Sequence, residues 1–72
     1  MSELAVRNRI REFRQERGDM TQADLAQTCG VTRQTIIALE AEKYSPSLEL
    51  AFKLARALGR NLEEIFRYAE KN

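Results

Sequence analysis

The sequence predicts a small all-α domain of five helices. Three observations carry this prediction: apolar residues recur every three or four positions, cap residues precede most of the apolar runs, and glycine or proline separates the runs. No run alternates between apolar and polar residues for long enough to predict a strand. The chain, 1–72, is therefore expected to form one domain, with its core over 5–66 and a short tail over 67–72.

The first helix is expected over 5–17 and is rich in charge. Its apolar residues recur at helical spacing: Val6, Ile10 and Phe13. Acidic residues alternate with a cluster of five arginines: Arg7, Arg9, Arg11, Arg14 and Arg17. Two interpretations of the cluster stay open. It is either a solvated face held by ion pairs or a stripe that binds phosphates. Gly18 is expected to end this helix.

Cap residues predict a second helix over 22–29 and a third over about 33–42. Thr21 and Asp24 form a variant of the capping box, in which two side chains satisfy free backbone N–H groups at a helix start. Thr32 is the N-cap candidate of the third helix. The inner face of that helix carries two apolar residues: Ile36 and Leu39.

Two further helices are expected in the second half of the chain. Pro46 cannot continue the third helix, and Ser47 can cap a fourth. The apolar stripe of the fourth helix ends before Gly59 and contains Leu48, Ala51, Ala55 and Leu58. Asn61 and Glu64 form another capping signature before a short fifth helix. The apolar residues of the fifth helix are Leu62, Ile65 and Phe66.

Composition excludes several classes of protein. Charged residues make up 32% of the chain but the net charge is only +1, so overall charge does not indicate nucleic-acid binding. No apolar stretch reaches the roughly 18 residues of a membrane span, and the N-terminus lacks the apolar core of a signal peptide. A cytoplasmic protein without a membrane partner is expected. The single cysteine, Cys29, is interpreted as a small core residue rather than a reactive thiol.

The chain also lacks the usual signatures of catalysis and of ligand binding. It has no histidine, no cluster of metal ligands and no glycine-rich phosphate loop, and its eleven acidic residues are scattered. We therefore expect no cofactor, no metal, no small-molecule ligand and no enzymatic activity.

The segment 21–40 has the features of a helix-turn-helix. Ala26 is small at the point where two helices must approach closely, and Gly30 lies in the turn, where a positive φ is expected. Val31 can fill the gap between the helices, and apolar residues anchor the next helix on the core. This order of residues favours a helix-turn-helix over a generic helical hairpin.

From Val6 to Phe66 the sequence resembles the Cro/cI-type (Xre-type) repressor family, and most of all its short stand-alone members. The matching segments are Thr21–Ala26, Val31–Ile36, Leu39–Glu40, Pro46–Glu49, Lys53–Gly59 and Leu62–Phe66. The resemblance implies a compact five-helix lambda-repressor-like domain and a twofold homodimer. It also implies transcriptional regulation, with repression the first expectation, at an operator in double-stranded DNA. A structural ion pair between Arg14 and Glu40 is implied as well.

In such a domain the third helix enters the major groove, with its N-terminal end at the base edges. The expected base contacts share its outward face: Arg33, Gln34, Ile37 and Ala38. An arginine can bind guanine and a glutamine can bind adenine. Arg33 could instead bind a phosphate or stay unbound, and Ile37 could contact a thymine methyl or be an ordinary exposed residue. Ala38 offers no hydrogen bond.

Contacts to the DNA backbone and to a second copy complete the expected site. Gln22 begins the second helix beside free N–H groups, which suits a phosphate. The expected backbone contacts are Gln22, Thr32, Thr35, Lys43 and Tyr44. The C-terminal segment carries more apolar residues than one short helix can bury, so a dimer interface is expected at Leu62, Phe66 and Tyr68. The dimer would bind a palindromic operator, with its recognition helices about 34 Å apart.

A protein-interaction module such as an antitoxin is the alternative. The chain offers almost no extra segment to hold a toxin, so DNA binding is the leading interpretation.

Overall fold

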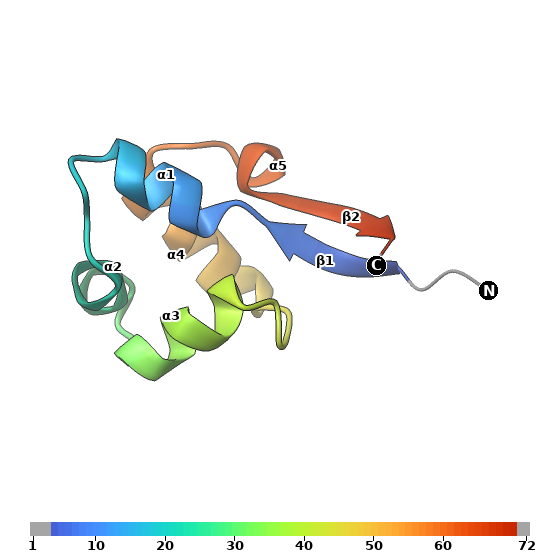
Figure 1. The fold of residues 1–72 in the computed structure, drawn as a ribbon, viewed down its shortest axis with the longest axis horizontal. Helices are drawn as coiled ribbons and strands as arrows, with labels where there is room; N and C mark the ends of the chain where they lie inside the picture. The colour runs from blue at the N-terminus through green and yellow to red at the C-terminus, as the bar shows by residue number, and fades with distance from the viewer. Residues whose placement is uncertain (1–3, 71–72) are drawn as a thin grey trace.

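The computed structural model describes residues 4–70, which form five helices and two strands (Figure 1). The elements follow one another as β1 (Leu4–Asn8), α1 (Ile10–Glu16), α2 (Gln22–Cys29), α3 (Arg33–Glu40), α4 (Leu48–Leu58), α5 (Leu62–Ile65) and β2 (Phe66–Glu70). The two ends of the expected domain, 1–3 and 71–72, lie outside the described residues.

The prediction of an all-α fold is wrong, because the two ends of the chain pair as an antiparallel ribbon. In this ribbon Val6 lies opposite Tyr68, and Asn8 lies opposite Phe66. β-branched and aromatic side chains pack well across strands, so the pair of Val6 and Tyr68 stabilises the ribbon. Figure 1 shows the ribbon extending away from the helices. Within the expected tail, residues 67–70 are thus strand, and Phe66 begins β2 instead of continuing α5.

The first helix begins at residue 10 rather than 5, and Asn8 supplies the reason. Its side-chain Oδ1 accepts a hydrogen bond from the backbone N–H of Ile10 (3.2 Å), which turns the chain between strand and helix. Its Nδ2 donates to the carbonyl oxygen of Leu39 at the end of α3 (2.8 Å). The backbone N–H of Arg9 donates to the carbonyl of Ile65 (2.8 Å), which ties the same turn to α5.

The caps predicted from the sequence define most of the helix boundaries. The Thr21 hydroxyl accepts from the N–H of Asp24 (3.0 Å), and the Asp24 carboxylate accepts from the N–H of Thr21 (3.1 Å). The backbone N–H of Thr21 lowers the pKa of the Asp24 carboxyl below its ordinary value, and the Thr21 hydroxyl adds to this effect. The hydroxyls of Thr32 and Ser47 cap α3 and α4 by accepting from the N–H groups of Thr35 and Leu50.

The core lies between the five helices and is apolar throughout. Among the described residues no polar or charged residue is fully buried. The largest fully buried side chains are Ile10, Leu25, Ile36, Leu39, Leu54, Leu58 and Ile65. Cys29 lies in this core with 2% of its surface exposed, and burial raises the pKa of its thiol. Within residues 4–70, no helix is long and apolar enough to cross a membrane, and no acidic, histidine or cysteine side chains gather as a metal site.

Candidate nucleic-acid interface

The turn between α2 and α3 holds the two helices in a fixed relation. Gly30 has φ +71°, a conformation that glycine adopts without steric cost. The N–H of Val31 donates to the carbonyl of Ala26 (3.0 Å), and the Val31 side chain packs against the core. Ala26 is buried, as a close helix crossing requires. α3 is therefore presented on a rigid support.

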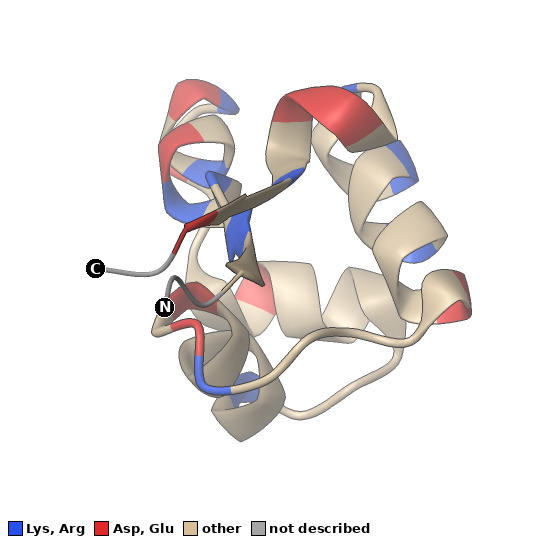
Figure 2. Ribbon diagram, turned by 90° about the vertical axis from the view of Figure 1, so that its right-hand side faces the viewer, with Lys and Arg blue, Asp and Glu red and all other residues tan. Residues whose placement is uncertain are grey.

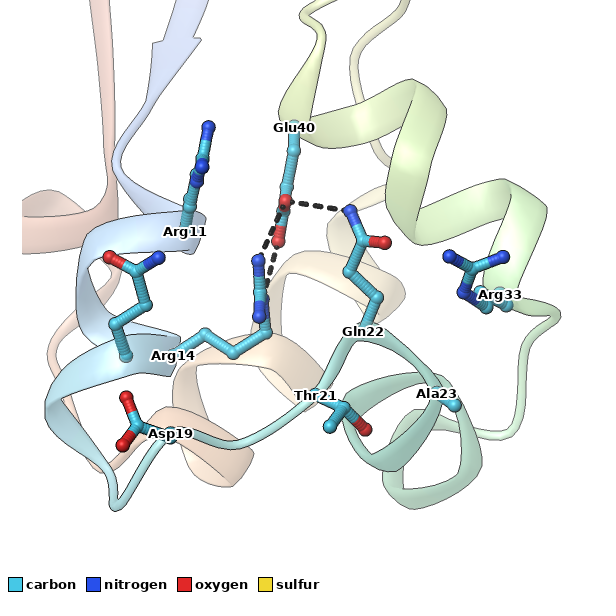
Figure 3. A pocket seen from close by; sticks show the side chains of 9 residues that line it. Arg11, Arg14, Asp19, Thr21, Gln22, Ala23, Arg33 and Glu40 are labelled. Carbon is cyan, nitrogen blue, oxygen red and sulfur yellow. Dashed lines mark hydrogen bonds and ion pairs between the residues drawn. The ribbon is translucent and has the colours of Figure 1, made fainter.

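Arg14 and Glu40 join α1 to α3 through a two-point contact (Figure 3). Arg14 Nε donates to Glu40 Oε2 (2.8 Å), and Nη2 donates to Oε1 (3.2 Å). Arg14 Nη1 also donates to the carbonyl of Met20 (2.8 Å), in the joint before α2. The two side chains are only 11% and 8% exposed. This network fixes α1, the joint and α3 relative to one another.

Gln22 belongs to the same network. Its Nε2 donates to Glu40 Oε1 (3.1 Å). Glu40 therefore accepts hydrogen bonds both from Arg14 and from Gln22, the first residue of α2. The first N–H groups of a helix have no partner within that helix and carry its positive end. Gln22, at the start of α2, lines an open hollow (Figure 3). The hollow is lined by Arg11, Arg14, Gln15, Asp19, Thr21, Gln22, Ala23, Arg33 and Glu40.

The early arginine cluster divides according to its partners. Arg7 pairs with Glu42 (2.7 Å) and Arg9 pairs with Glu12 (3.0 Å). These two arginines fit the interpretation of the cluster as a face held by ion pairs. Arg11 differs from these two arginines, because it has no ion-pair partner within residues 4–70. It lines the hollow across from Arg33 (Figure 3).

Sequence reasoning did not single out Arg11, although the sequence contains a signal. No acidic residue lies three or four positions before or after it, whereas Arg9 has Glu12 three positions away. Arg14 and Arg17 also lack an acidic residue at these spacings, so the signal alone does not separate Arg11 from them.

The outward face of α3 carries the expected base contacts. Arg33 and Gln34 are exposed at its N-terminal end, while Ile37 and Ala38 are half-buried. The hydroxyls of Thr32 and Thr35 lie 3.1 Å apart at the start of the helix. Lys43 and Tyr44 are exposed in the segment that follows α3, and Lys43 has no ion-pair partner among the described residues.

The helix ends earlier than expected, at Glu40 instead of about 42. Glu42 has φ +58°, in the left-handed region, which ends the helix before Lys43.

Two of the three residues expected at a dimer interface, Leu62 and Phe66, line a second, apolar hollow. Leu62 and Phe66 are half-buried and pack on the core, and Tyr68 is 70% exposed on the same face of β2 as Phe66. The hollow is lined by Val6, Ser45, Pro46, Leu48, Ala51, Leu62 and Phe66. At its edge Leu48 exposes 68% of its surface.

Comparison with known proteins gives a consistent result. The model of the family described as Helix-turn-helix matches residues 10–65. An HTH-type transcriptional regulator of Methanothermobacter thermautotrophicus is 61% identical over 62 residues, which cover 85% of this chain and 88% of that protein. The transcriptional repressor RstR of a cryptic phage in Vibrio cholerae is 37% identical, over 90% of this chain and 58% of its own length.

A solved structure agrees with these sequence matches. The crystal structure of a protein from Bacteroides fragilis, described as DNA-binding, superposes with a TM-score of 0.77 at 27% identity, and the match covers 86% of this chain and 98% of that one.

Proposed function

The chain belongs to the Cro/cI type of the helix-turn-helix family, whose members regulate transcription. We propose that it represses transcription by binding a palindromic operator as a homodimer. One observation carries the proposal. The exposed N-terminal end of α3 lies beside a hollow that combines the start of α2 with Arg11 and Arg33, two cations without ion-pair partners among the described residues. A DNA-binding regulator of this kind acts in the cytoplasm, where its operator lies.

In this proposal α3 reads the bases of the major groove. Gln34 is the principal reader, because its carboxamide can bond adenine N6 and N7 together. Arg33 lies beside Gln34 at the start of α3 and can bond guanine O6 and N7. Ile37 and Ala38 lie further along the same face, where they can only make apolar contacts such as one with a thymine methyl.

The phosphates on either side of the groove would bind the start of α2 and the segment after α3. Glu40 orients Gln22, and the adjacent N–H groups suit an anion. Thr32, Thr35, Lys43 and Tyr44 are the remaining proposed contacts on the α3 side. To these we add Arg11, which faces the hollow from α1. Such contacts fix the register of the protein on DNA but carry no sequence information.

The second copy would cover the apolar hollow between β1, α4 and β2. Leu48 and Tyr68 are among the most exposed large apolar side chains of the described chain, and Leu62 and Phe66 lie beside them. A large exposed apolar patch is typical of an interaction surface. A stable interface buries about 800 Å² on each partner, a moderate share of the 5074 Å² that this chain exposes.

Two substitutions test the assignment of roles on DNA. Gln34→Ala should relax the preference at one base pair in each half-site and leave the salt dependence nearly unchanged. Lys43→Ala should weaken binding to operator and random DNA alike, and lower the salt slope by about one for each lost phosphate contact. The measurement is affinity for operator, single-base variants and random DNA over a series of salt concentrations. Unchanged base preferences in Gln34→Ala would contradict the proposed docking.

The dimer surface has a matched pair of variants on one helix. Leu48→Lys places a charge at the apolar hollow, whereas Phe52→Lys places one on another exposed part of α4. Sedimentation equilibrium should show a dimer for the unaltered chain and for Phe52→Lys, and a monomer for Leu48→Lys. A monomeric unaltered chain at high micromolar concentration would contradict the dimer. Dissociation by Phe52→Lys alone would move the interface to the other surface.

A further inference from the structure

Glu42 has a backbone conformation that its residue type disfavours. Its φ of +58° lies in the left-handed region, where a side chain crowds the following carbonyl. Among the non-glycine residues described, only Asp19 shares this region, and aspartate tolerates it better than glutamate does. Glu42 also lies directly before Lys43, a proposed phosphate contact. Residues held in such conformations persist only where their surroundings enforce them.

The Glu42 carboxylate is held by the ribbon. Oε1 accepts from Arg7 Nε (2.7 Å), and Oε2 accepts from the backbone N–H of Asn8 (2.9 Å). These contacts outweigh the effect of partial burial and lower the pKa of Glu42, so the side chain is charged at neutral pH. Asn8 in turn donates to the carbonyl of Leu39 (2.8 Å). The end of β1 is therefore tied both to the last turn of α3 and to the residue that follows it.

Backbone hydrogen bonds at the end of α3 set the direction in which the chain leaves the helix at Lys43. The N–H of Glu42 donates to the carbonyl of Leu39 (2.9 Å), and the N–H of Lys43 donates to that of Ala38 (3.1 Å). The chain therefore turns sharply at Glu42, and the turn is held from outside by the ribbon. Lys43 leaves this turn as an exposed cation.

We propose that Glu42 is a positioning residue for DNA binding. By tying the terminal ribbon to the end of α3, it holds Lys43 at the phosphate backbone. The inference rests on the proposed function and adds to it a role for the ribbon, which the base and phosphate contacts do not include. Glu42 itself does not touch DNA, since its carboxylate is occupied by Arg7 and Asn8.

Charge and position predict opposite effects of removing this carboxylate. A negative charge near the proposed interface repels DNA, so charge alone predicts tighter binding when Glu42 is neutralised. Loss of positioning predicts weaker binding. Glu42→Gly is the informative variant, because glycine adopts a positive φ freely and keeps the turn while the side-chain clamp is lost. Glu49→Gln is the matched control: it removes one carboxylate, 82% exposed, that makes no contact with the ribbon.

The experiment measures operator affinity and its salt slope for the unaltered chain, Glu42→Gly, Lys43→Ala, their double variant and Glu49→Gln. Each is assayed at a temperature where circular dichroism shows it folded. We expect Glu49→Gln to bind as tightly as the unaltered chain or more tightly, and Glu42→Gly to bind several-fold more weakly. Lys43→Ala should lower the salt slope by about one per lost contact in the unaltered chain. In the Glu42→Gly background it should change the slope little, because the contact is already lost.

The outcomes separate the inference from the proposed function. If Glu42→Gly binds as tightly as the control and Lys43→Ala costs the same in both backgrounds, Glu42 has no positioning role. Glu42→Gln gives a second reading, because its amide keeps one acceptor for Asn8 and should retain part of the affinity that Glu42→Gly loses. If the unaltered chain binds no DNA at either low or high salt, the proposed function is wrong and the inference falls with it.

Discussion

The ion pair between Arg14 and Glu40 offers a strong test of what holds this domain together. Arg14→Ala removes three hydrogen bonds, two to Glu40 and one to the carbonyl of Met20. The Glu40 carboxylate, only 8% exposed, then keeps Gln22 as its single donor within the network. Breaking a buried pair by removing one partner costs about 3–5 kcal/mol, because the remaining charge is left without compensation.

That magnitude is large for a chain of this size. At about 0.05–0.15 kcal/mol per residue, 72 residues have a total unfolding free energy of roughly 4–11 kcal/mol. Arg14→Ala should therefore remove between about a quarter and all of the free energy of unfolding. For a domain of 60–100 residues each 1 kcal/mol shifts Tm by about 4–8 °C, so we expect a decrease of at least roughly 12 °C.

Chemical denaturation of three variants measures the effect. Arg14→Met combined with Glu40→Leu should cost less than Arg14→Ala, since no buried charge is left unpaired. The control is Lys53→Ala, which breaks an exposed pair with Glu49 and should cost less than about 0.5 kcal/mol. If Arg14→Ala cost no more than Lys53→Ala, the pair would be fully solvated in solution, and the argument that it fixes α1 against α3 would fail.

Two further predictions concern titration and thiol chemistry. The backbone N–H of Asn8 lowers the pKa of Glu42, and Arg7 and, more weakly, Arg67 add to this effect. The contribution of Glu42 to stability is therefore complete above its ordinary pKa of 4.5 and is lost as the pH falls below that value. Unfolding midpoints measured from pH 6 to pH 2 should fall more steeply for the unaltered chain than for Glu42→Gln. Burial raises the pKa of the Cys29 thiol. Labelling by a thiol reagent at neutral pH should therefore be slow in the folded protein and fast in denaturant. Rapid labelling under native conditions would indicate an open core.

The helices were predictable from the sequence where their boundaries depend on neighbouring residues. The second helix has the predicted bounds because Thr21 and Asp24 cap its start and Gly30 closes its end. Each of these features acts within four residues, so it can be read from the sequence. The end of α3 was placed two residues late, because a glutamate does not indicate the left-handed turn that its distant partners enforce.

The ribbon could not be predicted from local pattern. Its two strands come from opposite ends of the chain, and each has only five residues. Val6 also stands at helical spacing from Ile10 and Phe13, so the segment looked like the first turn of a helix. Asn8 was the available signal, since asparagine favours the end of one element and the start of another. The pairing of Val6 with Tyr68 depends on the tertiary fold, which brings the two ends together.

The near-neutral charge of the chain constrains how it can bind DNA. Figure 2 shows acidic and basic residues interspersed along the helices. Attraction to DNA must then come from the few cations near α3 that have no carboxylate partner within residues 4–70: Arg11, Arg33 and Lys43. Two or three phosphate contacts per protomer would give the proposed dimer a salt slope of about −4 to −5. These phosphate contacts form on operator and random DNA alike, so they do not distinguish the two. Discrimination must come mainly from the side chains on the outward face of α3.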